Sequence, residues 1–329
     1  MQYQKREAFS ESPSPVGRGW GGSFSSTLNR TMRKALLLLT LSITLFHCTD
    51  PVDLPSRFEE PELVVEAWLT NKPEPQTILL TESQDYYDNR LPTLVTGAQV
   101  IVCETQDGTP TSNCFVFEDE GEGRYVWTPA PGETIGEVGM EFGLGIQRGD
   151  KQYASVTSMN RTALLDSISF QFEEASLGLE EGIYAQIFAR DQVGIGDAYL
   201  IRTTINDTLL LRPFELNVAF DATFDPGTET DGITFIFPIR FSINKTDDNG
   251  AQIPLQEGEK VAVEIWSLSP EAYFFLSVAG EQVINGGSGL FDIPVVSSPG
   301  NVFDVDSGER VLGVFNVAAV VAAERTVGE

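Results

Sequence analysis

The sequence predicts an all-β protein in which two β-sandwich-like domains follow a signal peptide. Short segments that alternate apolar and polar side chains recur along most of the chain, and Gly, Pro and Asp clusters separate them. Only one segment, near residues 270–283, has apolar residues at helical spacing. The chain has 329 residues, of which 41% are hydrophobic and 21% are charged, and this composition is typical of a globular protein with room for two domains.

The first domain is predicted over residues 63–160 as an immunoglobulin-like sandwich. Its opening segment LVVEAWLT places Leu63, Val65, Ala67 and Leu69 on one face of a strand. Six further strands are predicted at residues 76–81, 98–104, 113–118, 123–128, 140–147 and 151–159. Seven short strands in about 100 residues, with no helix between them, favour a sandwich, but their spatial order is not readable from spacing.

A second, larger β-domain is predicted over residues 161–329. Its strands are expected at residues 164–172, 183–189, 198–205, 215–220, 233–243, 260–268 and 310–321. One short helix interrupts them. Ser269 and Pro270 are favourable residues for the N-cap and the first turn, and the apolar stripe that follows is expected to pack on a sheet.

The N-terminal region predicts export from the cytoplasm. In residues 32–47, the basic pair Arg33 and Lys34 precedes an apolar stretch over residues 35–46. That stretch would be about 18 Å long as a helix, which is too short for the roughly 30 Å hydrocarbon core of a membrane and typical of a signal peptide. Cys48 follows at the place of a lipid-modified cysteine, although His47 stands where that pattern usually has a small residue.

This layout sets the expected ends of the mature protein. Residues 1–31 read as an upstream extension of the reading frame, so that translation would start at Met32. Residues 48–62, rich in Pro and charge, read as a tether between a lipid on Cys48 and the first domain. A plain secretory signal with an incidental cysteine is the alternative.

Charge and histidine content exclude several functions. The whole chain carries a formal charge of −27, and the part after residue 47 carries −31. Such an acid excess argues against nucleic-acid binding, which needs clustered cations. The only histidine is His47, so removal of the signal peptide leaves none. Histidine-dependent triads, general bases and zinc sites are thereby excluded, while carboxylate and lysine chemistry remain open.

The two remaining cysteines, Cys103 and Cys114, lie in alternating segments on either side of a turn signal at Asp107 and Gly108. Folding the segment about its midpoint brings them opposite each other. In an oxidising compartment this arrangement predicts a cross-strand disulfide, and two free thiols are the alternative.

Candidate ligand sites lie in loops. Tyr86 and Tyr87 are adjacent in a polar loop, where they could stack on a sugar or face a protein. Calcium is a candidate cofactor, because it binds oxygen ligands of acidic turns, but none of these turns matches an EF-hand and simple Asx turns are the alternative. The acidic candidates are Asp247, Asp248, Asp304 and Asp306.

No catalytic residue is predicted. Ser242 and Lys245 have the spacing of a serine–lysine acylase, but that chemistry needs both on one helix face, and they are expected at the end of a strand. A pair of glycosidase-like carboxylates can be drawn anywhere in so acidic a chain, so its presence is uninformative.

Several segments in order resemble a known family. They are DPVDLP after Cys48, LVVEAWLT, TGAQV, GRYV, LLDSI, DQVGIGDAYLIR, EKVAVEIWSLSPEAYFFL, PGNV and LGVF. Over roughly residues 48–320 the chain resembles the lipoproteins grouped as domain of unknown function 4249. The resemblance implies a Bacteroidota envelope lipoprotein, often encoded beside TonB-dependent outer-membrane receptors, and it implies no catalytic residues.

We therefore expect a non-enzymatic lipoprotein, anchored in the outer membrane through Cys48, that assists or binds a TonB-dependent receptor. A stand-alone surface protein that binds glycan or peptide through the loop with Tyr86 and Tyr87 is the alternative. A carboxylate-based hydrolase is the third hypothesis.

Overall fold

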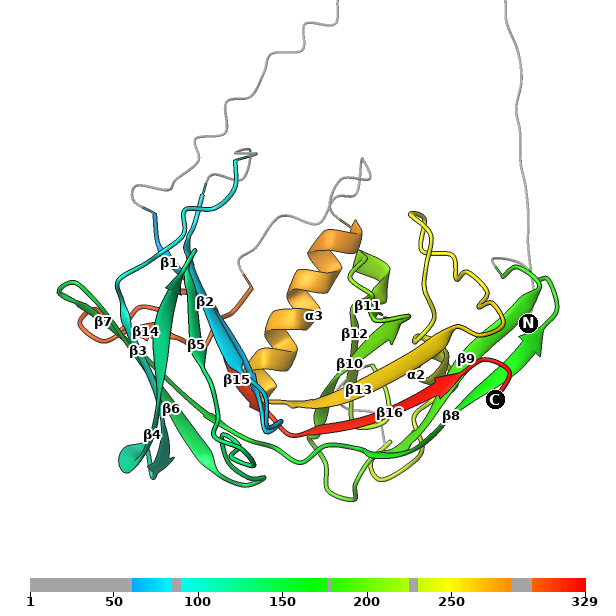
Figure 1. Cartoon of the computed structure of the whole chain (residues 1–329), viewed down its shortest axis with the longest axis horizontal. Helices are drawn as coiled ribbons and strands as arrows, with labels where there is room; N and C mark the ends of the chain where they lie inside the picture. The colour runs from blue at the N-terminus through cyan, green and yellow to red at the C-terminus, as the bar shows by residue number, and fades with distance from the viewer. Residues whose placement is uncertain (1–60, 85–89, 177–178, 225–229, 286–297) are drawn as a thin grey trace, which may run out of the picture. The chain divides into compact units, whose positions relative to one another are not determined.

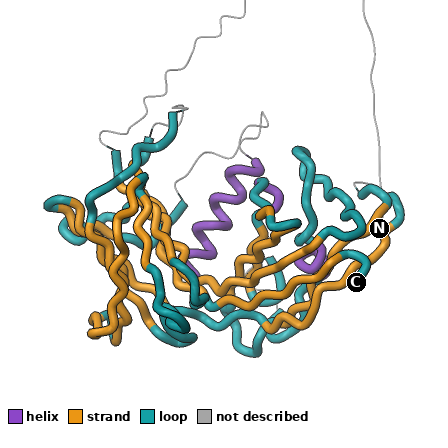
Figure 2. Tube along the Cα trace, viewed as in Figure 1, coloured by secondary structure: helices purple, strands orange, loops and turns teal. Residues whose placement is uncertain are grey.

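The structure is a computed structural model, which describes residues 61–84, 90–176, 179–224, 230–285 and 298–329. All of these residues fall within one compact unit. Most of them lie in strands or in the loops between strands, as Figure 2 shows, so the all-β prediction is confirmed. The predicted signal peptide and tether lie outside the described residues.

A nine-stranded sheet contains the first strands of the chain and two of the last (Figure 1). Its strand order is β14-β7-β6-β3-β4-β5-β2-β1-β15, and every pair is antiparallel except β1 with β15. The strands are β1 (Leu63–Thr70), β2 (Gln76–Glu82), β3 (Gln99–Gln106), β4 (Thr109–Gly121), β5 (Arg124–Trp127), β6 (Glu141–Arg148), β7 (Lys151–Ser158), β14 (Phe303–Asp304) and β15 (Leu312–Ala318).

The alternation of side chains accounts for the core of this sheet. Leu63, Val65, Ala67 and Leu69 of β1 are all buried, as their shared face predicts. They pack with inward residues of the other strands, among them Phe142 of β6. All seven strands predicted between residues 63 and 160 are present, with ends shifted by a few residues and β4 longer than expected.

A five-stranded sheet and a two-stranded sheet share a second core. The five-stranded sheet has the order β11-β10-β13-β16, and β12 pairs with β10. The strands of both sheets are β8 (Leu164–Glu173), β9 (Gly182–Arg190), β10 (Ala198–Ile205), β11 (Thr208–Leu209), β12 (Asn217–Phe220), β13 (Lys260–Leu268) and β16 (Val320–Thr326). Alternate residues such as Ile201, Val263 and Ile265 face this core, and β8 packs beside β16.

The C-terminal segment joins the two larger sheets. The single strand predicted at residues 310–321 is instead β15 in the nine-stranded sheet, then Ala319, then β16 in the five-stranded sheet. The predicted domain boundary at residue 160 assigns β14 and β15 to the second domain. In the structure, both strands lie in the same sheet as the strands of the first predicted domain. A parallel partner for β1 must come from a distant part of the chain, and local spacing does not reveal which part.

One helix is confirmed, and one predicted strand is wrong. Helix α3 (Pro270–Asn285) starts after Ser269, whose hydroxyl accepts a hydrogen bond from the Ala272 N–H, and it packs against β15, β10 and β13. The strand predicted at residues 233–243 is wrong, since helix α2 (Phe237–Phe241) occupies its centre. Pro238 has no N–H to donate to a ladder, and it suits the first turn of a helix. A 3-10 turn, η1 (Pro213–Glu215), is also present.

Asn301 links the two ends of the nine-stranded sheet. Its side-chain oxygen accepts a hydrogen bond from the Phe315 N–H at 2.8 Å, and its side-chain nitrogen donates to the Phe315 carbonyl at 2.8 Å. Its own carbonyl accepts a hydrogen bond from the Ser155 hydroxyl of β7 at 2.6 Å. The buried asparagine therefore takes the place of a strand residue between β7 and β15.

Two glycines, Gly300 and Gly313, allow the segment with Asn301 to lie close to β15, and β15 to lie close to β1. A Cβ on Gly300 would lie 2.3 Å from the carbonyl oxygen of Gly313, and a Cβ on Gly313 would lie 2.0 Å from the carbonyl oxygen of Val65. Gly313 also has a φ of +94°, which an L-residue rarely adopts. The PGNV and LGVF segments of the sequence therefore meet where β15 joins β1 and faces Asn301.

Asn316 then ties β15 to the five-stranded sheet. Its side-chain oxygen accepts a hydrogen bond from the Ser269 N–H at 2.8 Å, and its side-chain nitrogen donates to the Ser267 carbonyl at 3.2 Å. The Ser267 hydroxyl accepts a further bond from the Ala319 N–H at 2.9 Å. These buried polar groups pair with one another at the crossing between the sheets.

The substitution Asn301→Ala is expected to lower the free energy of unfolding by about 2–5 kcal/mol, because it leaves the N–H and C=O of Phe315 buried without partners. Denaturant unfolding of the full chain measures this. The matched control is Asn113→Ala at an exposed position, where the change should stay within about 0.5 kcal/mol. Equal effects of the two substitutions would contradict the assigned role of Asn301.

Candidate functional site

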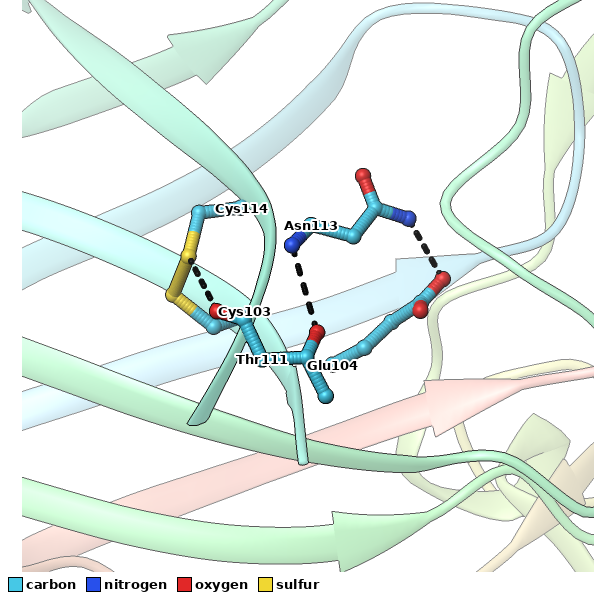
Figure 3. The surroundings of a disulfide bond; sticks show 5 residues. All are labelled: Cys103, Glu104, Thr111, Asn113 and Cys114. Carbon is cyan, nitrogen blue, oxygen red and sulfur yellow. Dashed lines mark hydrogen bonds between the residues drawn. A yellow bond between two sulfur atoms is a disulfide. The ribbon is translucent and has the colours of Figure 1, made fainter. Parts of the chain in front are cut away.

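The predicted cysteine pair lies in the hairpin of β3 and β4, where Cys103 and Cys114 are direct cross-strand partners. Their sulfurs are bonded at 2.10 Å and their Cα atoms are 4.0 Å apart (Figure 3). Beside them, the side-chain nitrogen of Asn113 donates to a carboxylate oxygen of Glu104 at 2.6 Å. The disulfide thus ties two neighbouring strands together, and its surroundings are those of a structural crosslink.

The predicted lipidation site Cys48 and the predicted ligand-binding residues Tyr86 and Tyr87 lie outside the described residues. Their roles stay predictions.

The acidic turns proposed for calcium use their carboxylates to hold the backbone. Asp247 accepts hydrogen bonds from the N–H groups of Asn249 and Ala251, at 2.9 and 2.8 Å. Asp304 does the same for residues 306 and 307, at 2.9 and 3.0 Å. These backbone bonds lower the pKa of both carboxyls, that of Ala251 contributing most at Asp247.

The other two calcium candidates do not complete a site. Asp248 lies 3.5 Å from the guanidinium of Arg212, and Asp306 is exposed. In the described part of the chain, no three Asp, Glu, Cys or His side chains converge as metal ligands. At Asp247 and Asp304 the carboxylate accepts a hydrogen bond from the N–H two residues further on, which is the geometry of an Asx turn.

Ser242 and Lys245, the serine–lysine pair, bind different residues. The Ser242 hydroxyl donates to the Ile239 carbonyl at 2.5 Å, and Lys245 forms an ion pair with Glu259 at 3.0 Å. Ser242 caps helix α2 rather than ending a strand, so the structural reason that we expected was wrong. Both side chains hold local structure.

A cluster that the site prediction missed surrounds the loop of residues 191–197, which connects β9 to β10. From one side, the Nε of Arg161 donates to both carboxylate oxygens of Asp197, at 3.0 and 2.9 Å. The terminal nitrogens of Arg161 donate to three carbonyls of the loop, those of Gln192, Val193 and Gly194, at 3.2, 2.9 and 2.7 Å. One guanidinium therefore binds both a carboxylate and the backbone of the 191–197 loop.

Carboxylates hold the same loop from other directions. Asp221 accepts hydrogen bonds from the N–H groups of Gly196 and Asp197, at 2.8 and 3.0 Å. Asp231 accepts one from the Gly194 N–H at 2.7 Å. Arg161 therefore donates to three carbonyls of the 191–197 loop, and aspartates accept from three of its N–H groups, so that side chains hold much of its backbone.

The start of the loop is held by a buried pair. Asp191 accepts a hydrogen bond from the Tyr199 hydroxyl at 2.5 Å and another from the Gly232 N–H at 2.9 Å. Burial raises the pKa of the Asp191 carboxyl, and burial also raises the pKa of the Tyr199 hydroxyl, which therefore keeps its proton and remains the donor. The hydrogen bond to Asp197 raises the pKa of Arg161, so the guanidinium stays charged.

This anchored loop exposes two aliphatic side chains. Val193 is 81% exposed and Ile195 is 84% exposed. Gly194 and Gly196 alternate with them at φ values of +124° and +103°, a backbone conformation that suits glycine. A Cβ on Gly194 would lie 2.7 Å from the guanidinium of Arg161, so that position also needs glycine for close contact.

The arrangement supports recognition better than chemistry. The carboxylates of Asp191, Asp197, Asp221 and Asp231 all accept hydrogen bonds that position the loop or its neighbours. What the loop presents outward is apolar surface on a fixed backbone. The signal in the sequence was VGIG between two aspartates, where a simple turn would have carried polar residues.

Residues 49–324 match the model of a family described as domain of unknown function (DUF4249). No curated protein matches the chain. Among the described residues, no helix has the length and apolar character needed to cross a membrane.

Replacing both Cys103 and Cys114 by serine is expected to lower the free energy of unfolding by about 3 kcal/mol, because the crosslink closes a short loop with a sequence separation of 11. Denaturant unfolding with and without reductant measures this. The double serine variant should not respond to reductant. Two alkylatable thiols at these positions in the unreduced protein would contradict the disulfide.

The substitution Arg161→Ala is expected to lower the free energy of unfolding by about 2–4 kcal/mol, because it leaves the nearly buried Asp197 without its partner. It should also speed hydrogen exchange in the loop, at the N–H of Gly194 and Gly196. The matched control is Arg190→Ala, which breaks an exposed pair with Asp166 and should cost less than about 1 kcal/mol. Unchanged exchange in the Arg161 variant would show that the guanidinium does not hold the loop.

Proposed function

The chain belongs to the family called domain of unknown function 4249, and from this premise we propose that it is a non-enzymatic outer-membrane lipoprotein that binds a TonB-dependent receptor. The sequence supports the anchor, because an apolar signal segment ends at Cys48. The resemblance to envelope lipoproteins supports the class of partner. The observation that carries the binding role is the 191–197 loop with its exposed Val193 and Ile195.

A fixed loop is a favourable docking element. Binding usually loses affinity because loops and side chains must become ordered, and a loop that is already held by hydrogen bonds avoids much of that cost. Exposed single aliphatic residues are ordinary on protein surfaces. Here two of them, Val193 and Ile195, lie on a backbone that Arg161, Asp221 and Asp231 hold in place. Such a pair can form the apolar centre of an interface, with charged residues at its rim.

The alternative is a stand-alone surface protein that binds glycan or peptide through Tyr86 and Tyr87. A carboxylate-based hydrolase is third. It would require two carboxylates free to reach a substrate, whereas those around the 191–197 loop accept hydrogen bonds from the protein itself.

The test is co-purification of the full chain with receptor from native membranes in mild detergent. The double substitution Val193→Ser and Ile195→Ser is expected to reduce the recovered TonB-dependent receptor at least about tenfold, because it removes the apolar centre of the interface. The matched control is Val116→Ser with Val138→Ser, since both residues are exposed at 61% and 51% and lie elsewhere.

Three outcomes would count against the proposal: no receptor recovered with the wild-type chain, equal recovery with the loop variant, or equal loss with the control variant. Loss of glycan or peptide binding on replacing Tyr86 and Tyr87 by alanine would favour the alternative.

A further inference from the structure

A cavity of about 400 Å³ lies at the edge of the nine-stranded sheet, between β7 and the segment that contains Asn301. Its lining comprises residues 154–156 of β7, Gly300, Asn301, Phe303, Glu271 at the first turn of α3, and Arg310. Its volume is within the range of small-ligand sites. None of the residues predicted from the sequence as binding or catalytic lines it.

The ladder between β7 and β14 stops at this cavity. Strand β14 pairs with β7 at Tyr153 and Ala154 only, and the next link toward the cavity is the hydrogen bond from the Ser155 hydroxyl to Asn301. The carbonyl of Gln152 accepts a hydrogen bond from the Val305 N–H, so Gln152 directs its backbone groups toward the outer edge. In an antiparallel strand, the backbone N–H and C=O groups of every second residue point to the same side. Those of Val156, four residues after Gln152, therefore also point toward the outer edge.

Val156 therefore presents an N–H and a C=O at an open edge. On the opposite side, β7 pairs with β6 over its whole length. Toward the outer side, the described residues supply no backbone partner for Val156. Its side chain is 49% exposed. An open strand edge of this kind is where an extended peptide can add backbone hydrogen bonds.

The cavity also carries one charge of each sign. The guanidinium of Arg310 lies 5.4 Å from the centre of the Phe303 ring, and no ion pair joins it to a carboxylate in the described chain. Glu271 is exposed and, within the same residues, has no cation partner. In a chain with a formal charge of −27, Arg310 thus places a cation beside an aromatic ring and an open strand edge.

We propose that this cavity binds an extended peptide segment that ends in a free carboxylate. The peptide backbone pairs with Val156, its carboxylate binds Arg310, an apolar side chain packs against Phe303, and a cationic group pairs with Glu271. Such a peptide has a group to match each of these parts of the lining. A small organic anion would bind Arg310 but would not pair with the edge of β7. The site is separate from the 191–197 loop and goes beyond receptor docking.

The experiment uses the purified full chain in mild detergent. A library of linear hexapeptides with free C-termini is selected against it, and enriched peptides are resynthesised with a fluorophore at the N-terminus for anisotropy. The substitution Arg310→Ala is expected to weaken binding at least about tenfold, through loss of a charge-assisted pair. Val156→Pro is expected to weaken it at least about fivefold, because proline removes the outward N–H.

Matched controls separate recognition from folding. Val156→Thr keeps the edge N–H and should bind within about twofold of the wild type, and Arg124→Ala removes an arginine that is paired with Glu120 and should also leave binding unchanged. If Val156→Pro does not fold, single N-methylation along the peptide replaces it, with loss of binding expected at the position that pairs with β7.

Two results would overturn the proposal. One is a selection that enriches no peptide whose binding depends on Arg310. The other is binding that needs Arg310 but withstands both Val156→Pro and every N-methylation, which would identify a simple anion site. Neither result bears on the receptor proposal, because that depends on Val193 and Ile195.

Discussion

The structure depends on the hydrogen bonds by which Asn301 holds β15. Strand β15 pairs with β1 on one side, and on its other side Asn301 supplies the backbone of Phe315 with both an acceptor and a donor. The contact is possible because Gly300 and Gly313 have no Cβ. From β15 the chain continues through Ala319 into β16, so one segment places both large sheets. Because β15 contributes to the core of the nine-stranded sheet and β16 packs against the second core, this segment couples the stability of the two cores.

Asparagine side chains bind the unpaired backbone groups of strands at several places in this fold. Where a buried strand has no neighbouring strand on one side, the N–H and C=O groups that point to that side need other partners. Asn244 satisfies both backbone groups of Ala185, at 2.8 and 2.9 Å, as Asn301 does for Phe315. Asn316 bridges Ser267 and Ser269. An asparagine amide carries the same donor and acceptor as a peptide unit, so it can replace one.

The two proposed surfaces are both built where regular pairing stops. The 191–197 loop leaves β9 and is held by Arg161 and by aspartates, which frees Val193 and Ile195 to face outward. The cavity beside β7 lies where the pairing of β14 with β7 ends. Beyond that point, one hydrogen bond joins Ser155 of β7 to Asn301. In each case polar side chains bond to part of the local backbone, and apolar side chains remain exposed beside them.

The sequence predicts the all-β class, the first seven strands, the helix after Ser269 and the pairing of Cys103 with Cys114, because all of these follow from alternation, spacing and capping within short segments. It misassigned residues 233–243, where Pro238 outweighed an apolar pattern. The folded chain places β15 beside β1, Arg161 against the 191–197 loop, and Arg310 and Val156 at the same cavity. These contacts join residues far apart in the chain, and local patterns carry no information about which distant segments meet.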